Sequence, residues 1–313
     1  MNTHTKAYTA ALSYTFIIGF ALFFVKIALT VGSPLDTLAH RFTVAIIVAS
    51  VPIWLGKVRI HMKWKDILSI FPLALLYPTL FFMLQAFGLV TTSSSEAGII
   101  TATTPIMTML LASLFLKERT SHLQKFFMFL SVTGVIYIFV MKGFNLNNSS
   151  LQGTFLVFLS TLSTACYSVL ARKLVQRIPL YSLVYVMTIF GFIIFNGVSI
   201  TQHIVNHSLS DFITPLYNIK FIGAILYLGI LSSLVTSFCS AYALSKISAS
   251  KMSVFSNLTT FITVLAGVIF LNESLQLYHL IGGIIILTGV IGVLTQREKH
   301  RIIPMCSAMK KQV

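Results

Sequence analysis

The sequence predicts an all-α integral membrane protein with ten transmembrane helices, arranged as two inverted-topology five-helix repeats, with both termini cytoplasmic. Three observations predict this fold. Of the 313 residues 56% are hydrophobic and only 9% are charged, whereas a soluble domain has about 25% charged residues. Apolar runs of membrane-spanning length recur along the chain, and the second half repeats the first at a fixed offset. This composition argues against a soluble globular enzyme and, since aromatic residues alone reach 12%, against a disordered chain.

Each predicted span is a run of mostly apolar residues near the length of about 20 that crosses a bilayer as an α-helix. The runs cover approximately residues 9–31, 39–55, 67–88, 96–116, 123–141, 152–171, 180–201, 220–243, 250–271 and 277–295. Transmembrane β-strands need only about 9–11 alternating residues, so a barrel is not predicted. The first run contains Lys26 and a second run follows at once, so we interpret it as a retained helix rather than a signal peptide.

The positions of Lys and Arg predict the orientation, because cytoplasmic loops of membrane proteins are enriched in both. With the N-terminus inside, only Arg41, Lys142 and Lys220 fall on the outer side. The same bias accounts for the net charge of +15 without a nucleic-acid partner. We therefore expect a multi-pass protein of the cytoplasmic (inner) membrane, with a basic cytoplasmic tail at residues 297–313. We expect this tail to fix the topology, and contact with anionic membrane lipid is the alternative.

The second half of the chain repeats the first at an offset of 155 positions. The matching pairs are Ser93–Ser95 with Ser248–Ser250, Glu118 with Glu273, and Thr133–Ile136 with Thr288–Ile291. An odd number of spans in each half places the second half upside down, which is typical of secondary transporters that work by alternating access to a midplane site. The predicted units are residues 1–145, 146–296 and the tail 297–313.

This pattern resembles the EamA-type branch of the drug/metabolite transporter superfamily over about residues 9–295. The segments that carry the resemblance are Phe24-Val25-Lys26, His40-Arg41-Phe42, Thr104-Pro105, Leu114–Glu118 and Thr133-Gly134-Val135. The chain departs from the family pattern at Ile18, where Trp is usual, and at Lys117 and Asn272, where Gly is usual. The resemblance implies a helical bundle with a central cavity among spans 1, 3, 4, 6, 8 and 9. It also implies transport of metabolites such as amino acids, amines or nucleobases.

Polar and aromatic residues at helical spacing are the candidates for substrate binding. They are Tyr77, Phe81, Gln85, Thr104, Ser163, Tyr167, Tyr227, Ser233, Asn257 and Thr260. A large polar group facing lipid is costly, so we expect Gln85, Tyr167 and Asn257 to face the cavity. The Ser and Thr positions also fit hydrogen bonds between packed helices. Breaks in helical hydrogen bonding are expected at Pro72, Pro78 and Pro105.

Charged residues inside the predicted spans are few. Lys26 is the one cation within a span, and we expect it to meet a substrate carboxylate; neutralising Asp36 or Glu96 is the alternative. Arg41 is expected to anchor the second span at the membrane interface, with contact to a substrate phosphate as the alternative. The acids lie near span ends, which argues against a mid-membrane proton relay. Glu96 is the one acid we consider for coupling, against the alternative that it only faces a helix dipole.

These observations predict a secondary transporter, independent of ATP, for a small organic metabolite, an amino acid or a related carboxylate or zwitterion. No catalytic constellation or phosphate-binding motif is evident, so an enzyme is not predicted. His203 and His207 have no evident third ligand, so neither a metal site nor a cofactor is predicted. The alternatives are an intramembrane enzyme, a scaffold or receptor, and a transporter of cationic or aromatic solutes such as a quaternary amine, nucleobase or drug. A homodimer through the small face of Gly282 and Gly289 is also left open.

Overall fold

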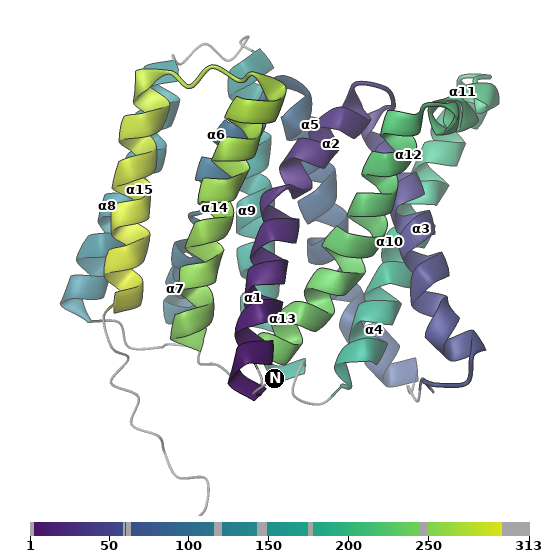
Figure 1. Cartoon of the computed structure of the whole chain (residues 1–313), viewed down its shortest axis with the longest axis horizontal. Helices are drawn as coiled ribbons and strands as arrows, with labels where there is room; N and C mark the ends of the chain where they lie inside the picture. The colour runs from purple at the N-terminus through teal and green to yellow at the C-terminus, as the bar shows by residue number, and fades with distance from the viewer. Residues whose placement is uncertain are drawn as a thin grey trace, which may run out of the picture.

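The computed structural model describes residues 3–58, 60, 64–115, 121–142, 149–174, 178–244 and 249–295, and the regular structure in these ranges is helical throughout. Eight helices among the described residues are long and apolar enough to cross a membrane. The helices stand side by side in one bundle (Figure 1). The predicted all-α, multi-pass membrane architecture is therefore confirmed, while the count of ten spans, the inverted repeat and the cytoplasmic termini stay predictions.

The first half of the chain forms five membrane-crossing segments, three of which are interrupted. The elements are α1 (Thr3–Gly19), α2 (Ala21–Leu29), α3 (Pro34–Trp54), α4 (Trp64–Ala74), the π-helical η1 (Leu75–Leu80), α5 (Phe81–Thr91), α6 (Ser94–Thr101), α7 (Thr104–Phe115) and α8 (His122–Lys142). Helix α3 starts at a side-chain cap: the Ser33 hydroxyl accepts the amide of Asp36. Ser93 caps α6 in the same way through the amide of Glu96.

The second half continues with a long helical pair and a broken helix before two apolar helices close the bundle. The elements are α9 (Ser149–Leu174), α10 (Leu180–Val205), α11 (Leu209–Ile213), the 3₁₀ turn η2 (Thr214–Tyr217), α12 (Ile219–Leu226), the π-helical η3 (Tyr227–Val235), α13 (Thr236–Leu244), α14 (Ala249–Leu271) and α15 (Leu277–Thr295). Helix α1 begins and α15 ends at the lower end of Figure 1, whereas α3 and α6 begin at the upper end. "Lower end" and "upper end" keep this meaning below.

The interrupted helices break where the chain loses regular hydrogen bonding. Tyr77, before Pro78, has an extended backbone (φ −140°, ψ 117°) inside η1. Helix α6 ends just before Pro105, whose ring nitrogen cannot donate a hydrogen bond. The breaks expected at Pro78 and Pro105 are thus confirmed, while α4 continues through Pro72. The sequence offset of 155 places η1 onto residues 230–235, which lie within η3, so both halves carry a π-helical segment at corresponding positions.

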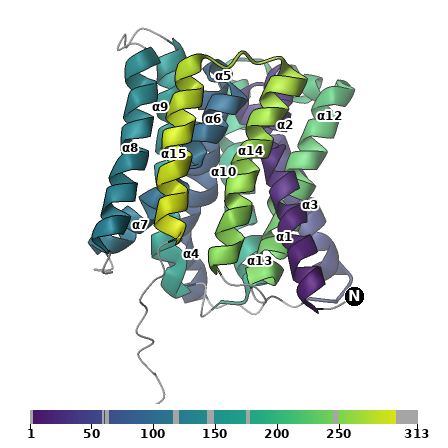
Figure 2. The ribbon, with the colours of Figure 1, turned by 60° about the vertical axis from the view of Figure 1, so that its left-hand side comes forward.

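The last helix packs against α8 rather than standing alone, as Figure 2 shows. A Cβ atom on Gly289 would lie 2.7 Å from the backbone oxygen of Phe127. Gly134 is equally tight, because its Cβ would lie 2.8 Å from Ile286. Small residues let two helices approach closely in a membrane, where apolar side chains gain little by leaving lipid. The small face predicted on the last span is therefore covered by α8 of the same chain.

Large apolar side chains cover the outside of the bundle. Phe115 and Phe129 are 73% and 69% exposed, and Ile193 is 57% exposed. Such a large exposed apolar surface is unfavourable in water, whereas it is favourable in the hydrocarbon core of a bilayer. Trp54 and Trp64, at the lower end of α3 and α4, are similarly exposed, as is usual for aromatic side chains at a membrane–water interface.

Candidate functional site

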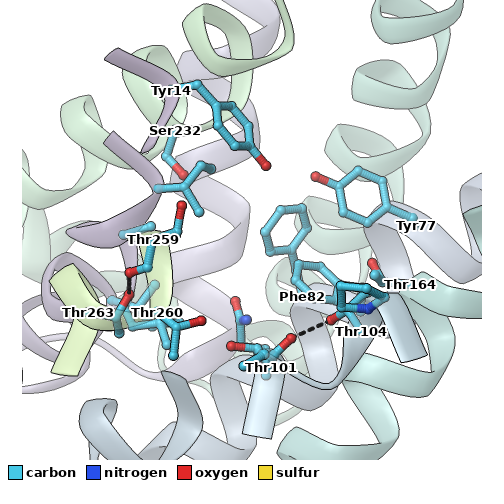
Figure 3. A pocket seen from close by; sticks show the side chains of 18 of the residues that line it. Tyr14, Tyr77, Phe82, Thr101, Thr104, Thr164, Ser232, Thr259, Thr260 and Thr263 are labelled. Atoms are coloured by element: carbon cyan, nitrogen blue, oxygen red, sulfur yellow. Dashed lines mark hydrogen bonds between the residues drawn. The ribbon is translucent and has the colours of Figure 1, made fainter. Parts of the chain in front are cut away.

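A cavity of about 370 Å³ lies between the helices, a volume in the range of small-molecule sites. Its lining comes from both halves of the chain (Figure 3). The aromatic members are Tyr14, Tyr77, Phe81 and Phe82, the uncharged polar members are Gln85, Thr101, Thr104, Thr164, Ser232, Thr259, Thr260 and Thr263, and the charged member is Arg41. A mostly apolar wall with a few polar groups is typical of a site that orients an organic ligand.

Two tyrosines face each other across this cavity. Figure 3 shows the hydroxyl groups of Tyr14, from α1, and Tyr77, from η1, pointing toward one another. The ring of Tyr77 also packs against Phe81 and Tyr167, with ring centroids 5.2 Å apart in both pairs. Each hydroxyl can donate a hydrogen bond to a polar group of a ligand or accept one from it, while the apolar part of the ligand contacts the rings.

Arg41 is the charged group of the cavity, and it is only 2% exposed. Its Nε and Nη2 atoms lie 3.3 Å and 3.2 Å from the hydroxyl of Ser233, and its guanidinium carbon lies 4.0 Å from the centre of the Phe82 ring. Among the described residues, no carboxylate forms an ion pair with it. The expectation that Arg41 anchors the second span at the interface is therefore wrong.

The backbone explains how Arg41 becomes buried. Gly229, in η3, lies so close to α3 that a Cβ atom there would be 2.9 Å from the backbone oxygen of Arg41. This close approach brings the hydroxyls of Ser232 and Ser233 to the guanidinium group. The segment His40-Arg41-Phe42 resembles the family pattern, but nothing in its local sequence indicates that η3 covers it.

Five of the predicted binding residues line the cavity: Tyr77, Phe81, Gln85, Thr104 and Thr260. The sequence reasoning did not include Tyr14, Phe82, Ser232, Thr259 and Thr263. Thr101 and Thr164 also line the cavity and are not among the predicted binding residues. These residues lie on helices that the sequence already predicts around the cavity. What the sequence does not predict is which face of each helix points inward.

Three other predicted residues, Ser163, Tyr167 and Tyr227, lie outside the lining. Ser163 donates a hydrogen bond of 2.9 Å to the backbone oxygen of Leu76, and thereby satisfies a carbonyl group of the broken helix. Tyr167 lies behind Tyr77. The Tyr227 hydroxyl donates to the oxygen of Ile17, at 2.8 Å. The side chain of Asn257 lies outside the described residues.

Ser233 was predicted at the cavity, and Ser232 lines it instead, with Ser233 holding Arg41 from behind. The prediction assumed α-helical spacing along the whole span. A π-helical turn contains more residues than an α-helical turn, so side chains within η3, such as those of Ser232 and Ser233, point in other directions than that spacing implies. The shift by one residue follows from this change of period.

Lys26 does not line the cavity. Its ammonium group lies close enough to the carboxylates of Glu273 and Glu96 to be attracted by both. Glu96 is 3% exposed; its Oε1 accepts the Thr154 hydroxyl at 2.6 Å, and its Oε2 lies 3.5 Å from His279 Nε2. The predicted alternative, in which Lys26 neutralises Glu96, therefore has a structural basis.

Asp36, in the first turn of α3, is a second buried carboxylate and is 4% exposed. Its Oδ1 accepts the Ser199 hydroxyl at 2.5 Å and lies 2.9 Å from Nε2 of His203. His203, one of the two histidines considered above as metal ligands, thus joins α10 to α3. Buried carboxylates need such partners, because a charge without them is costly.

The fold and the cavity define a multi-pass membrane protein with an internal site of small-molecule size, and comparison with known proteins identifies its family as one of transporters. The sequence profile of the EamA-like transporter family matches residues 5–140 and again residues 151–295. The chain belongs to this EamA-like transporter family.

Three similar proteins support this membership or the fold. The chain is 50% identical to the uncharacterized transporter YcxC of Bacillus subtilis, over 99% of both chains. It is 29% identical to an uncharacterized transporter of Archaeoglobus fulgidus, over 92% of this chain and 98% of the relative. A solved structure described as a crystal structure of a protein has the same fold, with a TM-score of 0.59, 14% identity, and coverage of 92% of this chain and 96% of the other.

Proposed function

We propose that the protein is a secondary transporter of the cytoplasmic membrane that moves a small organic carboxylate, either a simple organic anion or an amino acid. The observation that carries the proposal is Arg41, a buried cation that faces the cavity without a described carboxylate partner. Burying an unpaired charge costs several kcal/mol, and a carboxylate ligand would offset that cost with charge-assisted hydrogen bonds. Arg41 thus takes the role that the sequence assigned to Lys26.

The transport mechanism in this proposal is alternating access of two inverted repeats of five helices, with ten spans in all. Two findings support it: the family profile matches the chain twice, and η1 and η3 occupy corresponding positions. Broken helices at corresponding positions of two repeats are where secondary transporters bind substrate. Both segments contribute to the cavity, η1 through Tyr77 and η3 through Ser232.

A second candidate is a transporter of cationic or aromatic solutes. The rings of Tyr14, Tyr77, Phe81 and Phe82 favour it, because aromatic faces attract cations and stack on planar ligands. Arg41 opposes a cationic ligand through charge repulsion. An aromatic carboxylate would use both the rings and the guanidinium group.

Three probes with one phenyl ring and different charges separate these candidates: phenylpyruvate, phenylalanine and phenethylamine. A ligand that binds only the folded state raises the melting temperature with its concentration. We expect phenylpyruvate and phenylalanine to raise the melting temperature of the purified, detergent-solubilised protein, and phenethylamine to leave it unchanged. The two shifts should disappear in Arg41→Gln and persist in Lys220→Gln, which removes an exposed cation. An equal shift with phenethylamine, or a carboxylate shift that survives Arg41→Gln, would contradict the proposed substrate class.

A further inference from the structure

The charged residue and most threonines of the cavity lie on opposite sides of it. Arg41 belongs to α3, which packs against α5, α10 and η3. Figures 1 and 2 both show α3 apart from α6, α7 and α14. The latter three helices carry five of the lining threonines, called here the threonine wall: Thr101, Thr104, Thr259, Thr260 and Thr263. A ligand that binds Arg41 and fills the cavity therefore reaches the threonine wall.

The guanidinium group of Arg41 has hydrogen-bond donors left for a ligand. Its Nε and Nη2 atoms donate to Ser232 and Ser233, whereas Nη1 has no acceptor among the described residues. Gln85 is 7% exposed and lines the cavity, and its amide has no hydrogen-bond partner in the described part of the chain. Arg41 and Gln85 also share a narrow crevice beside the cavity, so they lie close together. Both can donate hydrogen bonds to a carboxylate.

The threonine wall is mainly an acceptor surface. The hydroxyls of Thr101, Thr104, Thr259 and Thr263 donate to backbone carbonyl groups, at 2.9, 2.6, 3.2 and 2.9 Å respectively. The dashed lines in Figure 3 mark two bonds of this kind within the wall. Because a hydroxyl has one hydrogen, each of these four groups can offer a ligand only its lone pairs. A ligand group that bonds to them must be a hydrogen-bond donor.

Thr260 is the member of the wall whose hydrogen is not already used. It is 7% exposed, it lines the cavity, and its hydroxyl has no hydrogen-bond partner in the described part of the chain. Figure 3 shows Thr260 between Thr263 and Thr101. A ligand group beside it can therefore accept from Thr260 while it donates to a neighbouring threonine. A hydroxyl group can do both, because it is a donor and an acceptor.

Aromatic side chains connect these two sides of the cavity. Tyr14, Tyr77, Phe81 and Phe82 all belong to the lining, and Figure 3 shows Thr259 and Thr263 across the cavity from Tyr77. An aromatic ring of a ligand packs favourably against such side chains. The cavity thus offers a cation, then aromatic rings, then hydrogen-bond acceptors along the path from Arg41 to the threonine wall.

The charge of the lining favours a neutral donor at the threonine wall. A carboxylate bound to Arg41 cancels the one positive charge among the described lining residues. An ammonium group at the far end would bring a second positive charge, and no described residue of the lining is an acid that could balance it. An unbalanced charge is costly away from water, whereas a hydroxyl group carries none.

We propose that the threonine wall binds a phenolic hydroxyl group, and that the substrate is an aromatic carboxylate with a hydroxyl on the end of the ring away from the carboxylate. This inference rests on the proposed function and narrows its substrate class. The carboxylate binds Arg41 and Gln85, and the ring packs among the aromatic side chains. The hydroxyl accepts from Thr260 and donates to a neighbouring threonine of the wall.

Three acids that differ in one substituent test the proposal: phenylpyruvate, 4-hydroxyphenylpyruvate and 4-fluorophenylpyruvate. Isothermal titration calorimetry of the purified, detergent-solubilised protein gives the Kd of each. We expect 4-hydroxyphenylpyruvate to bind about fivefold more tightly than phenylpyruvate, through the added hydrogen bond. The fluorine atom is small and cannot donate, so 4-fluorophenylpyruvate should bind like phenylpyruvate. Equal affinity of 4-hydroxyphenylpyruvate and either other acid would overturn the proposal.

Variants of the wall test where the hydroxyl binds, through the ratio of the Kd of phenylpyruvate to that of 4-hydroxyphenylpyruvate. This ratio should fall to about one in Thr260→Val, decrease in Thr101→Val, and be retained in Thr260→Ser, which keeps a hydroxyl. Thr133→Val is the matched control and should retain the ratio. The Thr133 hydroxyl also donates to a carbonyl of its own helix, at 2.7 Å, but it does not line the cavity. An unchanged ratio in both Thr260→Val and Thr101→Val would overturn the assignment of the wall.

Failure of this inference differs from failure of the proposed function. The carboxylate class fails if phenethylamine binds as well as phenylpyruvate, or if binding of phenylpyruvate survives Arg41→Gln. The threonine wall fails if phenylpyruvate binds through Arg41 and the ring hydroxyl adds nothing. Absence of binding by all three acids would overturn both.

Discussion

The carboxylate of Glu273 accepts two hydrogen bonds from Ser95, one from its backbone amide at 2.9 Å and one from its hydroxyl at 2.6 Å. The other oxygen of the same carboxylate accepts the amide of Ser94, at 2.6 Å. The first amides of a helix have no partner within the helix, and an anion there is stabilised by the helix dipole. A residue of the second half of the chain therefore caps a helix of the first half.

Glu273→Gln should lower the free energy of unfolding by about 1–3 kcal/mol, because an amide loses the charge-assisted character of these bonds and presents a donor to amides that need an acceptor. The measurement is the melting temperature of the purified protein. Asp211→Asn, on the exposed helix α11, should leave it unchanged. Equal melting temperatures for wild type and Glu273→Gln would show that the cap adds no stability.

Gly267→Ala tests the space around the same carboxylate. A Cβ atom at position 267 would collide with the Ser95 hydroxyl and the Glu273 carboxylate. We expect a loss of about 1–3 kcal/mol, the usual cost of overpacking. Gly197→Ala in α10, where nothing lies within 4 Å of the added atom, should change stability by less than about 0.5 kcal/mol. Similar stability for both variants would contradict the described approach of Glu273 to α14.

Arg41→Met should leave the melting temperature of the ligand-free protein unchanged or raise it, while it abolishes the shift caused by phenylpyruvate. The reason is that a buried charge without a carboxylate partner costs desolvation energy, which an apolar side chain of similar length does not. The two melting curves, with and without phenylpyruvate, give both results. A large loss of stability in the ligand-free variant would mean that the Ser232, Ser233 and Phe82 contacts already satisfy the guanidinium group.

Lys26→Gln should leave the phenylpyruvate shift intact, because Lys26 does not line the cavity. The melting curves of the variant with and without phenylpyruvate measure this shift. Loss of the thermal shift would restore the original prediction that Lys26 meets the substrate.

Tyr14→Phe should weaken phenylpyruvate binding about fivefold, equivalent to one hydrogen bond of about 1 kcal/mol. The variant removes one of the two hydroxyls that face each other across the cavity in Figure 3. Tyr217→Phe, which changes a hydroxyl on an 85% exposed residue, is the control and should bind normally. Unchanged affinity in Tyr14→Phe would indicate that the ligand does not reach α1.

Much of the architecture could be predicted from the sequence because the bilayer imposes it. Apolar runs must form helices where no water can satisfy the backbone, and small residues such as Gly134 and Gly289 identify tight helix contacts. The cavity could be predicted in part, because Gln85 and Thr260 are polar residues on helices expected around it.

The charged residues were harder to place, since their burial depends on contacts between distant segments. From its position near the start of a span, Arg41 is predicted to lie at the membrane interface. Only the close packing of Gly229 against α3 shows that Arg41 is buried. Lys26 looked like the buried cation of a substrate site, but the carboxylates near it come from α6 and from the connection before α15. The spacing of residues along the sequence does not show which distant segments come into contact.

The π-helical segment η3 also determines which changes of length its span can accept. Deleting one residue from Tyr227–Val235 would let this segment relax to the tighter α-helical period, and this change of period would absorb the deletion. Helix α13 would then keep the side that packs against α1. Single-residue deletions should therefore be tolerated better here than in α14, a regular α-helix in which a deletion rotates every following side chain by about 100°.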